Sequence, residues 1–270
     1  MRTKTLLLSG VVAALSSASL MAQVYSLNAV GYINVTIPPG FSIIANQLNT
    51  TNNNISPLLD SFVPSDGVSG LNACVFYKWS NPGTGAPGSW LALTPDYYGN
   101  YNNAPGAPGN FPWDQEAATN TTLNPGEAVF VKNGNSSNIV VTFVGTVLQG
   151  ALTNNSITGP GFNLVSSIVP QGGRIDVDLG FPEVDNDVVY IYNPSTSSSP
   201  GWQGFVGDEY ANGAPAVPWD SVTNPIVNVG QGFFYKANET GLTIGNATDG
   251  GATYTTGGYR DLWTRTFNVN

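Results

Sequence analysis

The sequence contains no histidine and a single cysteine among its 270 residues. The missing histidine excludes Ser-His-Asp and Cys-His nucleophile systems, histidine zinc sites and the most common general base. Cys74 stands alone, so it has no partner for an internal disulfide, and its position at the start of an apolar run predicts a buried strand residue. Glycoside hydrolysis by paired carboxylates is one chemistry that remains, because it needs no histidine.

Charged residues are also scarce, at 9% of the chain against roughly 25% in an ordinary soluble protein. Eight Lys and Arg stand against 17 Asp and Glu, which argues against nucleic acid and anionic membrane surfaces as partners. Asn, Thr, Ser and Gly replace the charges, and these residues disfavour helices. No organic cofactor is predicted, and the acidic excess leaves Ca²⁺ as the candidate ion.

The N-terminus has the pattern of a secretory signal peptide. Arg2 and Lys4 form a positive region, residues 6–20 are mostly apolar, and small residues lead to a cleavage site after Ala22. A membrane anchor is the weaker interpretation, because the apolar run is short and polar sequence follows at once. We therefore expect an exported protein, secreted or at the cell surface, with no membrane span in its mature form.

One pattern occurs twice, at 123–132 and 227–236: an Asn, a Gly, a Glu or Gln, and then three large apolar residues before a Lys. A glycine turn followed by such a run predicts entry into a strand that is covered on both faces. Further matching blocks follow in the same order in both halves, which indicates an internal duplication. They begin at 39 and 160, 55 and 175, 75 and 188, 87 and 199, 96 and 208, and 112 and 218.

These patterns predict an all-β protein with two tandem homologous antiparallel units, sandwich-like or barrel-like. We expect a signal peptide at 1–22, a first unit at 23–147, a second unit at 148–252 and a C-terminal strand or tail at 253–270. An alternating strand is predicted over 24–37, with a bulge at Gly31, and another at the C-terminal end. Such terminal strands either close their own sheet or add to a neighbour's edge. One helical turn is expected near 56–61.

Four segments carry a resemblance to other proteins: 28–32, 39–42, 125–128 with its later copy, and 143–145. In these segments the chain resembles secreted two-repeat β-rich proteins of uncharacterised function from Verrucomicrobia and related bacteria. The resemblance covers most of the mature chain and implies export and duplication. It implies no activity and no ligand.

Each half carries a candidate ligand-binding loop, in which an Asp-x-Tyr-x-Asn segment is followed by Pro-Trp-Asp. Carboxylates, an amide and aromatic faces in one loop can bind sugar hydroxyls and stack on a pyranose ring, or hold Ca²⁺. The alternative is turn formation, with Trp or Tyr anchoring the loop to the core. The candidates are Asp96, Tyr98, Asn100, Trp113 and Asp114, and then Asp208, Tyr210, Asn212, Trp219 and Asp220.

A second candidate is an acidic cluster between 176 and 187, where Asp185 and Asp187 flank an Asn and are possible Ca²⁺ ligands. The spacing lacks the EF-hand pattern, and acids in a solvated strand or turn are the alternative. A glycosidase would use the pair Asp96 with Asp114, or Asp208 with Asp220. Nothing in the spacing distinguishes acid from nucleophile.

Export, duplication, low charge and the missing catalytic groups favour a non-catalytic structural protein. It would form part of a surface layer, extracellular fibre or matrix by self-association, or join other surface proteins, through β-strand edges. The alternative function is carbohydrate binding through the duplicated Trp, Tyr and Asp loops. A glycosidase is the least favoured hypothesis, because an enzyme rarely carries its site twice.

Overall fold

The computed structural model describes residues 29–82, 87–98, 112–114, 116–158, 160–182, 187–194, 197, 200–207, 219–220, 223–237, 248–249, 252–253 and 263–269. In this part of the chain the protein is mostly β, as predicted, and every strand pairing is antiparallel. The sheets stay open, so the barrel-like form of the prediction does not apply to the described strands. None of the described helices has the length and apolar character needed to span a membrane.

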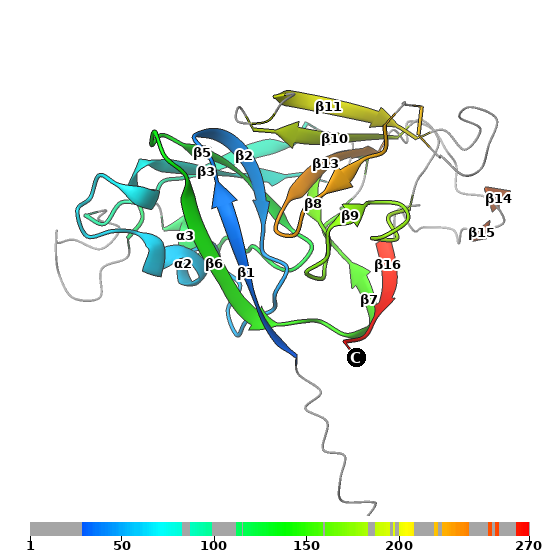
Figure 1. Cartoon of the computed structure of the whole chain (residues 1–270), viewed down its shortest axis with the longest axis horizontal. Coiled ribbons are helices and arrows are strands. Elements are labelled where there is room, and N and C mark those ends of the chain that lie inside the picture. The colour runs from blue at the N-terminus through cyan, green and yellow to red at the C-terminus, as the bar shows by residue number, and fades with distance from the viewer. Residues whose placement is uncertain are drawn as a thin grey trace, which may run out of the picture.

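Two four-stranded sheets form the centre of the fold (Figure 1). The first has the order β2 (Gly40–Ala45), β5 (Ala128–Asn133), β3 (Cys74–Ser80) and β4 (Ser89–Leu93). The second has the order β8 (Gly161–Ser166), β13 (Gly232–Ala237), β10 (Val188–Asn193) and β11 (Gly201–Val206). Equivalent strands also pair in matching register, since Phe41 lies opposite Lys132 and Phe162 lies opposite Lys236.

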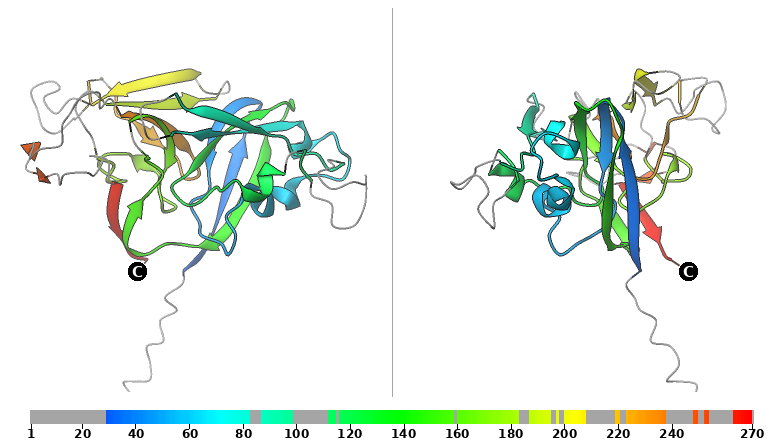
Figure 2. Two further views of the ribbon diagram at one scale, coloured as in Figure 1. Left: turned by 180° about the vertical axis from the view of Figure 1, so that it is seen from behind. Right: turned by 60° about the vertical axis from the view of Figure 1, so that its left-hand side comes forward.

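Two-stranded ribbons accompany the sheets and contain both terminal strands. β1 (Val30–Ile37) pairs along its whole length with β6 (Ile139–Thr146), and β7 (Gly150–Asn154) pairs with β16 (Trp263–Phe267). In Figures 1 and 2 both ribbons extend below the four-stranded sheets. The two alternating strands predicted near the ends of the chain are therefore paired within it.

The bulge expected at Gly31 is absent. Gly31 pairs one-to-one with Gly145, and the register continues on both sides. The glycine instead allows close packing, because a Cβ there would lie 3.3 Å from both Leu48 Cδ2 and Val147 Cγ2. The predicted alternation itself holds, since every second residue of β1 from position 33 to 37 is buried.

Short elements complete the described fold: α2 (Ile55–Leu59), the 3-10 turns η1 (Asp60–Phe62) and η2 (Gly70–Ala73), α3 (Ala117–Asn120), β9 (Gly173–Arg174), β12 (Ile226–Val227), β14 (Thr248–Asp249) and β15 (Ala252–Thr253). α2 and η1 occupy the segment where a helical turn was predicted. β9 pairs with β12, and β14 pairs with β15. The helices are a single turn or little more, as expected for a chain rich in Asn, Thr, Ser and Gly.

The buried apolar side chains form two separate cores and a third cluster between the sheets. Val129 and Val131 belong to the first core, and Phe233 and Tyr235 belong to the second. The third cluster consists of Ile43, Ala45, Ala128, Leu164 and Phe234. Because successive side chains point to opposite faces of a sheet, one face of each sheet covers its own core and the other meets the second sheet.

The contact between the sheets is made in the same way from both sides. Ala45 N donates to Gly230 O at 2.8 Å, and Ser166 N donates to Gly126 O at 2.7 Å. Ala45 and Ser166 hold equivalent places in β2 and β8, and the two glycines lie in equivalent turns before β5 and β13. Exchanging the two sheets therefore converts one contact into the other, as in the interface of a two-fold dimer.

Gly232 limits how closely the two sheets approach. A Cβ at this position would lie 2.3 Å from Ala128 Cβ and 2.8 Å from Ile43 Cγ2. We expect Gly232→Ala to lower the free energy of unfolding by about 2 kcal/mol or more, because the sheets must move apart to admit the methyl group. Urea unfolding followed by intrinsic fluorescence measures the loss.

Two further variants test the cause of that loss. Gly204→Ala in β11 is the matched control, because its Cβ meets Tyr190 Cε1 at 3.3 Å and should change stability by less than about 1 kcal/mol. Adding Ala128→Gly to Gly232→Ala removes the opposing methyl group and should recover part of the stability. Equal losses at 204 and 232 would contradict a special restriction at the contact between the sheets.

Candidate functional site

The two tryptophans predicted to stack on sugars are core residues. Trp113 and Trp219 are 0% and 1% exposed. Trp113 forms an antiparallel bridge with Pro95, and Trp219 forms one with Gly207. Neither indole has a face open to solvent, which corrects the stacking role predicted for them. Their positions fit the alternative interpretation, in which each Trp anchors its loop to the core.

Asp60 is the polar partner of Trp113 and was not selected from the sequence. Trp113 Nε1 donates to Asp60 Oδ1 at 2.7 Å, and Ser56 Oγ donates to Oδ2 of the same carboxylate at 2.8 Å. Burial raises the pKa of Asp60, although the two hydrogen bonds oppose the change. The carboxylate therefore serves to satisfy a buried indole, a structural task.

The first predicted loop does bring its two carboxylate residues together. Asp96 N donates to Pro112 O and Asp114 N donates to Thr94 O, each at 3.0 Å. Burial raises the pKa of Asp114, and the charge of Asp96 raises it further. Asp96 Oδ1 also accepts a hydrogen bond from Tyr98 N at 2.8 Å, which is the geometry of an Asx turn. Asp96 thus takes part in turn formation as well as facing a second acid.

The other residues of the predicted loops are only partly placed. Tyr98 is exposed at the surface, where its hydroxyl donates to Ser65 O at 3.2 Å. Asp220 is exposed, and its N–H donates to Val206 O at 2.8 Å. Asn100, Asp208, Tyr210 and Asn212 lie outside the described residues.

Asp187 is not placed as an open Ca²⁺ ligand. It is buried, and its carboxylate accepts a hydrogen bond from the Tyr235 hydroxyl. Its predicted companion, Asp185, lies outside the described residues. Asp176, in the same acidic cluster, forms an ion pair with Arg174 at 2.5 Å. Over the described ranges no group of three or more acidic or Cys side chains is arranged to hold a metal ion.

A groove lined by aromatic side chains lies between the two four-stranded sheets. Its volume is about 370 Å³, and we call it the aromatic groove. Its lining residues are Trp79, Trp90, Phe162, Tyr190, Trp202 and Phe234. Trp90 is 46% exposed and Trp202 is 50% exposed, whereas Phe234 is buried. The groove therefore has an apolar floor and indole walls that solvent can reach.

Strand alternation places these rings. Trp79 in β3 lies opposite Trp90 in β4, and Tyr192 in β10 lies opposite Trp202 in β11. These residues point to the face of each sheet that is turned away from its own core. β4 and β11 are edge strands of different sheets, so each sheet contributes one edge tryptophan to the same groove.

Phe234 forms the centre of the groove floor. Its ring centroid lies 5.8 Å from those of Trp90 and Trp202. The rings of Trp79 and Phe162 each lie 6.0 Å from it. Trp79 Nε1 also donates to Phe162 O at 2.6 Å, which ties the indole to the other sheet. The walls are held by these contacts before any ligand arrives, which reduces the entropy lost on binding.

None of the residues that line the aromatic groove is charged. Two lysines lie at equivalent places in the sheets, with Lys132 Nζ 5.9 Å from the centroid of Phe41 and Lys236 Nζ 5.9 Å from that of Phe162. These distances are those of cation–π contacts, which engage the lysines on ring faces. The groove itself thus suits an uncharged ligand with apolar faces.

The sequence alone did not identify the groove residues as a site. The blocks that contain Trp90 and Trp202 are visible only as repeated elements. The alternation of Tyr77 with Trp79, and of Tyr190 with Tyr192, is the signal that places rings on one face of each strand. Nothing in the pattern indicates that the two aromatic faces meet.

No known family model, curated protein or solved structure matches this chain. The functional argument therefore depends on the geometry and chemistry of the aromatic groove.

Proposed function

We propose that this chain is a non-catalytic protein that binds a neutral polysaccharide in the aromatic groove. The observation that carries the proposal is the pair of half-exposed tryptophans, Trp90 and Trp202, on edge strands of two different sheets that line one groove. Exposed apolar patches on a soluble protein mark interaction sites, and ligand pockets are typically lined by aromatic residues.

The chemistry of the lining favours sugars. A pyranose has an apolar face of C–H groups and a rim of hydroxyls, and an indole can pack against the face while water or amides bind the rim. The lining carries no charge that could compensate a charged ligand for the loss of its hydration, whereas a neutral ligand has no ionic hydration to lose. Ser80 and Asn81 follow Trp79 in the chain and supply polar groups beside the groove.

The same lining supports a role without catalysis. Glycoside hydrolysis requires two carboxyl groups that flank the bound glycosidic bond. Among the described residues no carboxylate lines the aromatic groove, and Asp96 and Asp114 do not belong to its lining. The purified protein should therefore bind oligosaccharides without releasing products.

A binding screen tests the proposal. The probes are six-unit cello-, xylo- and manno-oligosaccharides, an acidic alginate oligosaccharide and an apolar peptide, measured by calorimetry and tryptophan fluorescence. We expect at least one neutral oligosaccharide to bind with a fluorescence change and no hydrolysis. Binding of the peptide alone, or of no probe, would contradict the proposal.

We further propose that the two sheets derive from one duplicated unit and that residues 1–22 direct export. Identical strand order, matching register and the exchanged backbone contacts between the sheets support the duplication. In this interpretation the aromatic groove is a joint product of the two copies, because each contributes residues to it. The resemblance to secreted two-repeat proteins stays a prediction.

Self-assembly through strand edges is the second candidate function, and the outer face of the β1–β6 ribbon favours it. Val30 and Tyr32 are each 73% exposed, and Val140 and Val144 are also exposed. Neither strand contains a charged residue, and within the described part β1 pairs only with β6. Charges normally protect an exposed edge from pairing with another chain, and this edge lacks them.

Sedimentation of the purified protein over a range of concentrations tests assembly. If the edge of the ribbon joins a second copy, Tyr32→Lys should abolish oligomers, because it places a charge in the edge strand β1. Val68→Lys is the control, since Val68 is equally exposed outside the ribbon. Monomers at every concentration of the unmodified protein would remove this candidate.

A further inference from the structure

A polar pocket of about 360 Å³ adjoins the aromatic groove, and Trp79 lines both. We call it the polar pocket. Lys78, Thr122, Glu127, Asn155 and Ser156 are among its lining residues. The shared tryptophan makes the two spaces neighbours, so hydroxyl, amide and charged groups lie on the far side of Trp79 from the aromatic groove.

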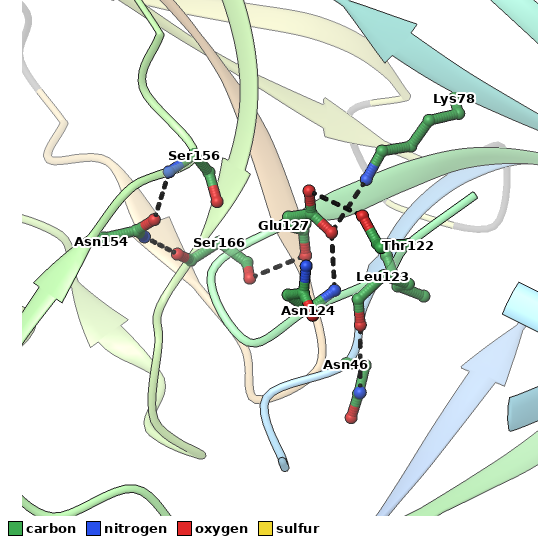
Figure 3. A network of polar contacts seen from close by, with 9 residues as sticks. All are labelled: Asn46, Lys78, Thr122, Leu123, Asn124, Glu127, Asn154, Ser156 and Ser166. Carbon is green, nitrogen blue, oxygen red and sulfur yellow. Dashed lines mark hydrogen bonds and ion pairs between the residues drawn. The ribbon is translucent and has the colours of Figure 1, made fainter. Parts of the chain in front are cut away.

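A partly buried ion pair lies at the polar pocket, with the side chains of Lys78 and Glu127 16% and 23% exposed (Figure 3). Lys78 Nζ lies 3.3 Å from Glu127 Oε2, and the lysine nitrogen is buried. Glu127 is otherwise occupied, since it accepts hydrogen bonds from Asn124 N at 2.6 Å and from Thr122 Oγ1 at 3.2 Å. Within the described residues no other acceptor is found for the ammonium group, which carries three protons. The pocket therefore contains unused donor capacity.

The structure also supplies an uncharged version of the same arrangement. A pocket at the equivalent place beside the second four-stranded sheet is lined by Tyr192 and Gln231, which correspond to Trp79 and Glu127. In that sheet Ile191 holds the strand position of Lys78. Gln231 Oε1 accepts from Asn228 N at 3.0 Å, so an amide closes the turn as Glu127 does. The turn thus requires an acceptor but no charge, and the ion pair needs another explanation.

Burial of the pair is unfavourable by itself. Burial lowers the pKa of Lys78, and the charge of Glu127 opposes this change. Breaking up the hydration of two ions usually offsets most of their attraction, so a buried pair is weak evidence for stability. A ligand oxygen that takes the remaining protons of Lys78 would recover hydrogen bonds that the protein leaves unmade.

We infer that the polar pocket is a second subsite for the same neutral polysaccharide, in which Lys78 donates hydrogen bonds to sugar hydroxyls beyond Trp79. This inference depends on the proposed function of the aromatic groove. It assigns different tasks to the two spaces: the groove holds the apolar faces of the sugar rings, and the pocket binds hydroxyls of a further unit. Affinity should therefore rise with the length of the oligosaccharide.

The test compares three- and six-unit cello-, xylo- and manno-oligosaccharides by calorimetry. Lys78→Ile with Glu127→Gln converts the pocket to the uncharged pattern of its counterpart. We expect this double variant to lose the gain in affinity between three and six units, roughly tenfold or more, while three-unit binding stays within about twofold of the unmodified protein. Lys132→Met, at a lysine outside the pocket, is the matched control.

A second variant covers the case in which the double variant fails to fold. Asn155→Trp fills the pocket from an exposed position without touching the ion pair and should remove the same length dependence. If either folded variant binds the six-unit probes as tightly as the unmodified protein, the subsite is refuted while the groove remains. If the unmodified protein binds none of the probes, the proposed function fails, and this inference fails with it.

Discussion

Replacing Trp90 and Trp202 together with Ala is expected to weaken glycan binding by roughly a hundredfold or more. Stacking of a nucleobase on one aromatic side chain contributes about 1–3 kcal/mol, and we expect the packing of a sugar face on each indole to be of the same order. Both indoles line the aromatic groove and stand about half exposed, so their removal takes away ligand contacts and little of the core. The free energy of unfolding should fall by less than about 2 kcal/mol. Calorimetry with the best neutral oligosaccharide and urea unfolding measure the two effects.

The single variants sharpen this result. Each should lose about tenfold in affinity or more, because the two walls come from different sheets and contact the ligand separately. Tyr97→Ala removes another exposed aromatic residue, outside the groove, and should leave binding unchanged. Undiminished binding by the folded double variant would refute the aromatic groove as the glycan site.

Trp113→Ala is expected to lower the free energy of unfolding by about 3–5 kcal/mol, the usual range for truncating a buried tryptophan. Trp113 is fully buried, and its ring packs edge-on against Phe76 with the centroids 5.7 Å apart. The variant also leaves the half-buried carboxylate of Asp60 without its indole donor. Chemical unfolding measures the loss, and a loss this large can prevent folding at ordinary temperatures.

Trp113→Phe separates packing from hydrogen bonding. It keeps most of the ring packing and removes the Nε1 donor, so a smaller loss of about 1–3 kcal/mol is expected. The folded Phe variant should bind oligosaccharides normally, since Trp113 does not line the aromatic groove. A weakened affinity with unchanged stability would restore the stacking role that the buried position argues against.

Several of the strands follow from local pattern. The runs that follow the glycine turns in 123–132 and 227–236 were predicted to enter strands and form β5 and β13, and the alternating strands predicted near the two ends of the chain form β1 and β16. The burial of Val129 and Val131 on one side, with Phe130 packed toward the other sheet, agrees with the strand that was predicted to be covered on both faces. Local pattern succeeds here because strand propensity and alternation act over a few residues.

The candidate site was predictable only in part. The structure brings the segments of Asp96 and Asp114 together, whereas Trp113, which was predicted to stack on a sugar, is buried in the core. The local sequence around a Trp in a polar loop is the same whether the ring points to solvent or to the core. The sequence showed the residues of the aromatic groove only as parts of strands or repeats. They share one environment because distant segments meet there; Trp90 and Trp202, for example, are more than 100 residues apart in the chain.

The sequence by itself determined the class of the fold, the positions of several strands and the matching order of sequence blocks in the two halves, because these depend on composition, alternation and turn residues close together in the chain. The tertiary structure decided which face of each sheet is buried and against which other element it packs. The approach of the two sheets at Ala128 and Gly232 brings two edge tryptophans to one groove and leaves the tryptophans of the loops in the cores. Burial depends on packing between distant segments, so no local pattern of residues could have decided it.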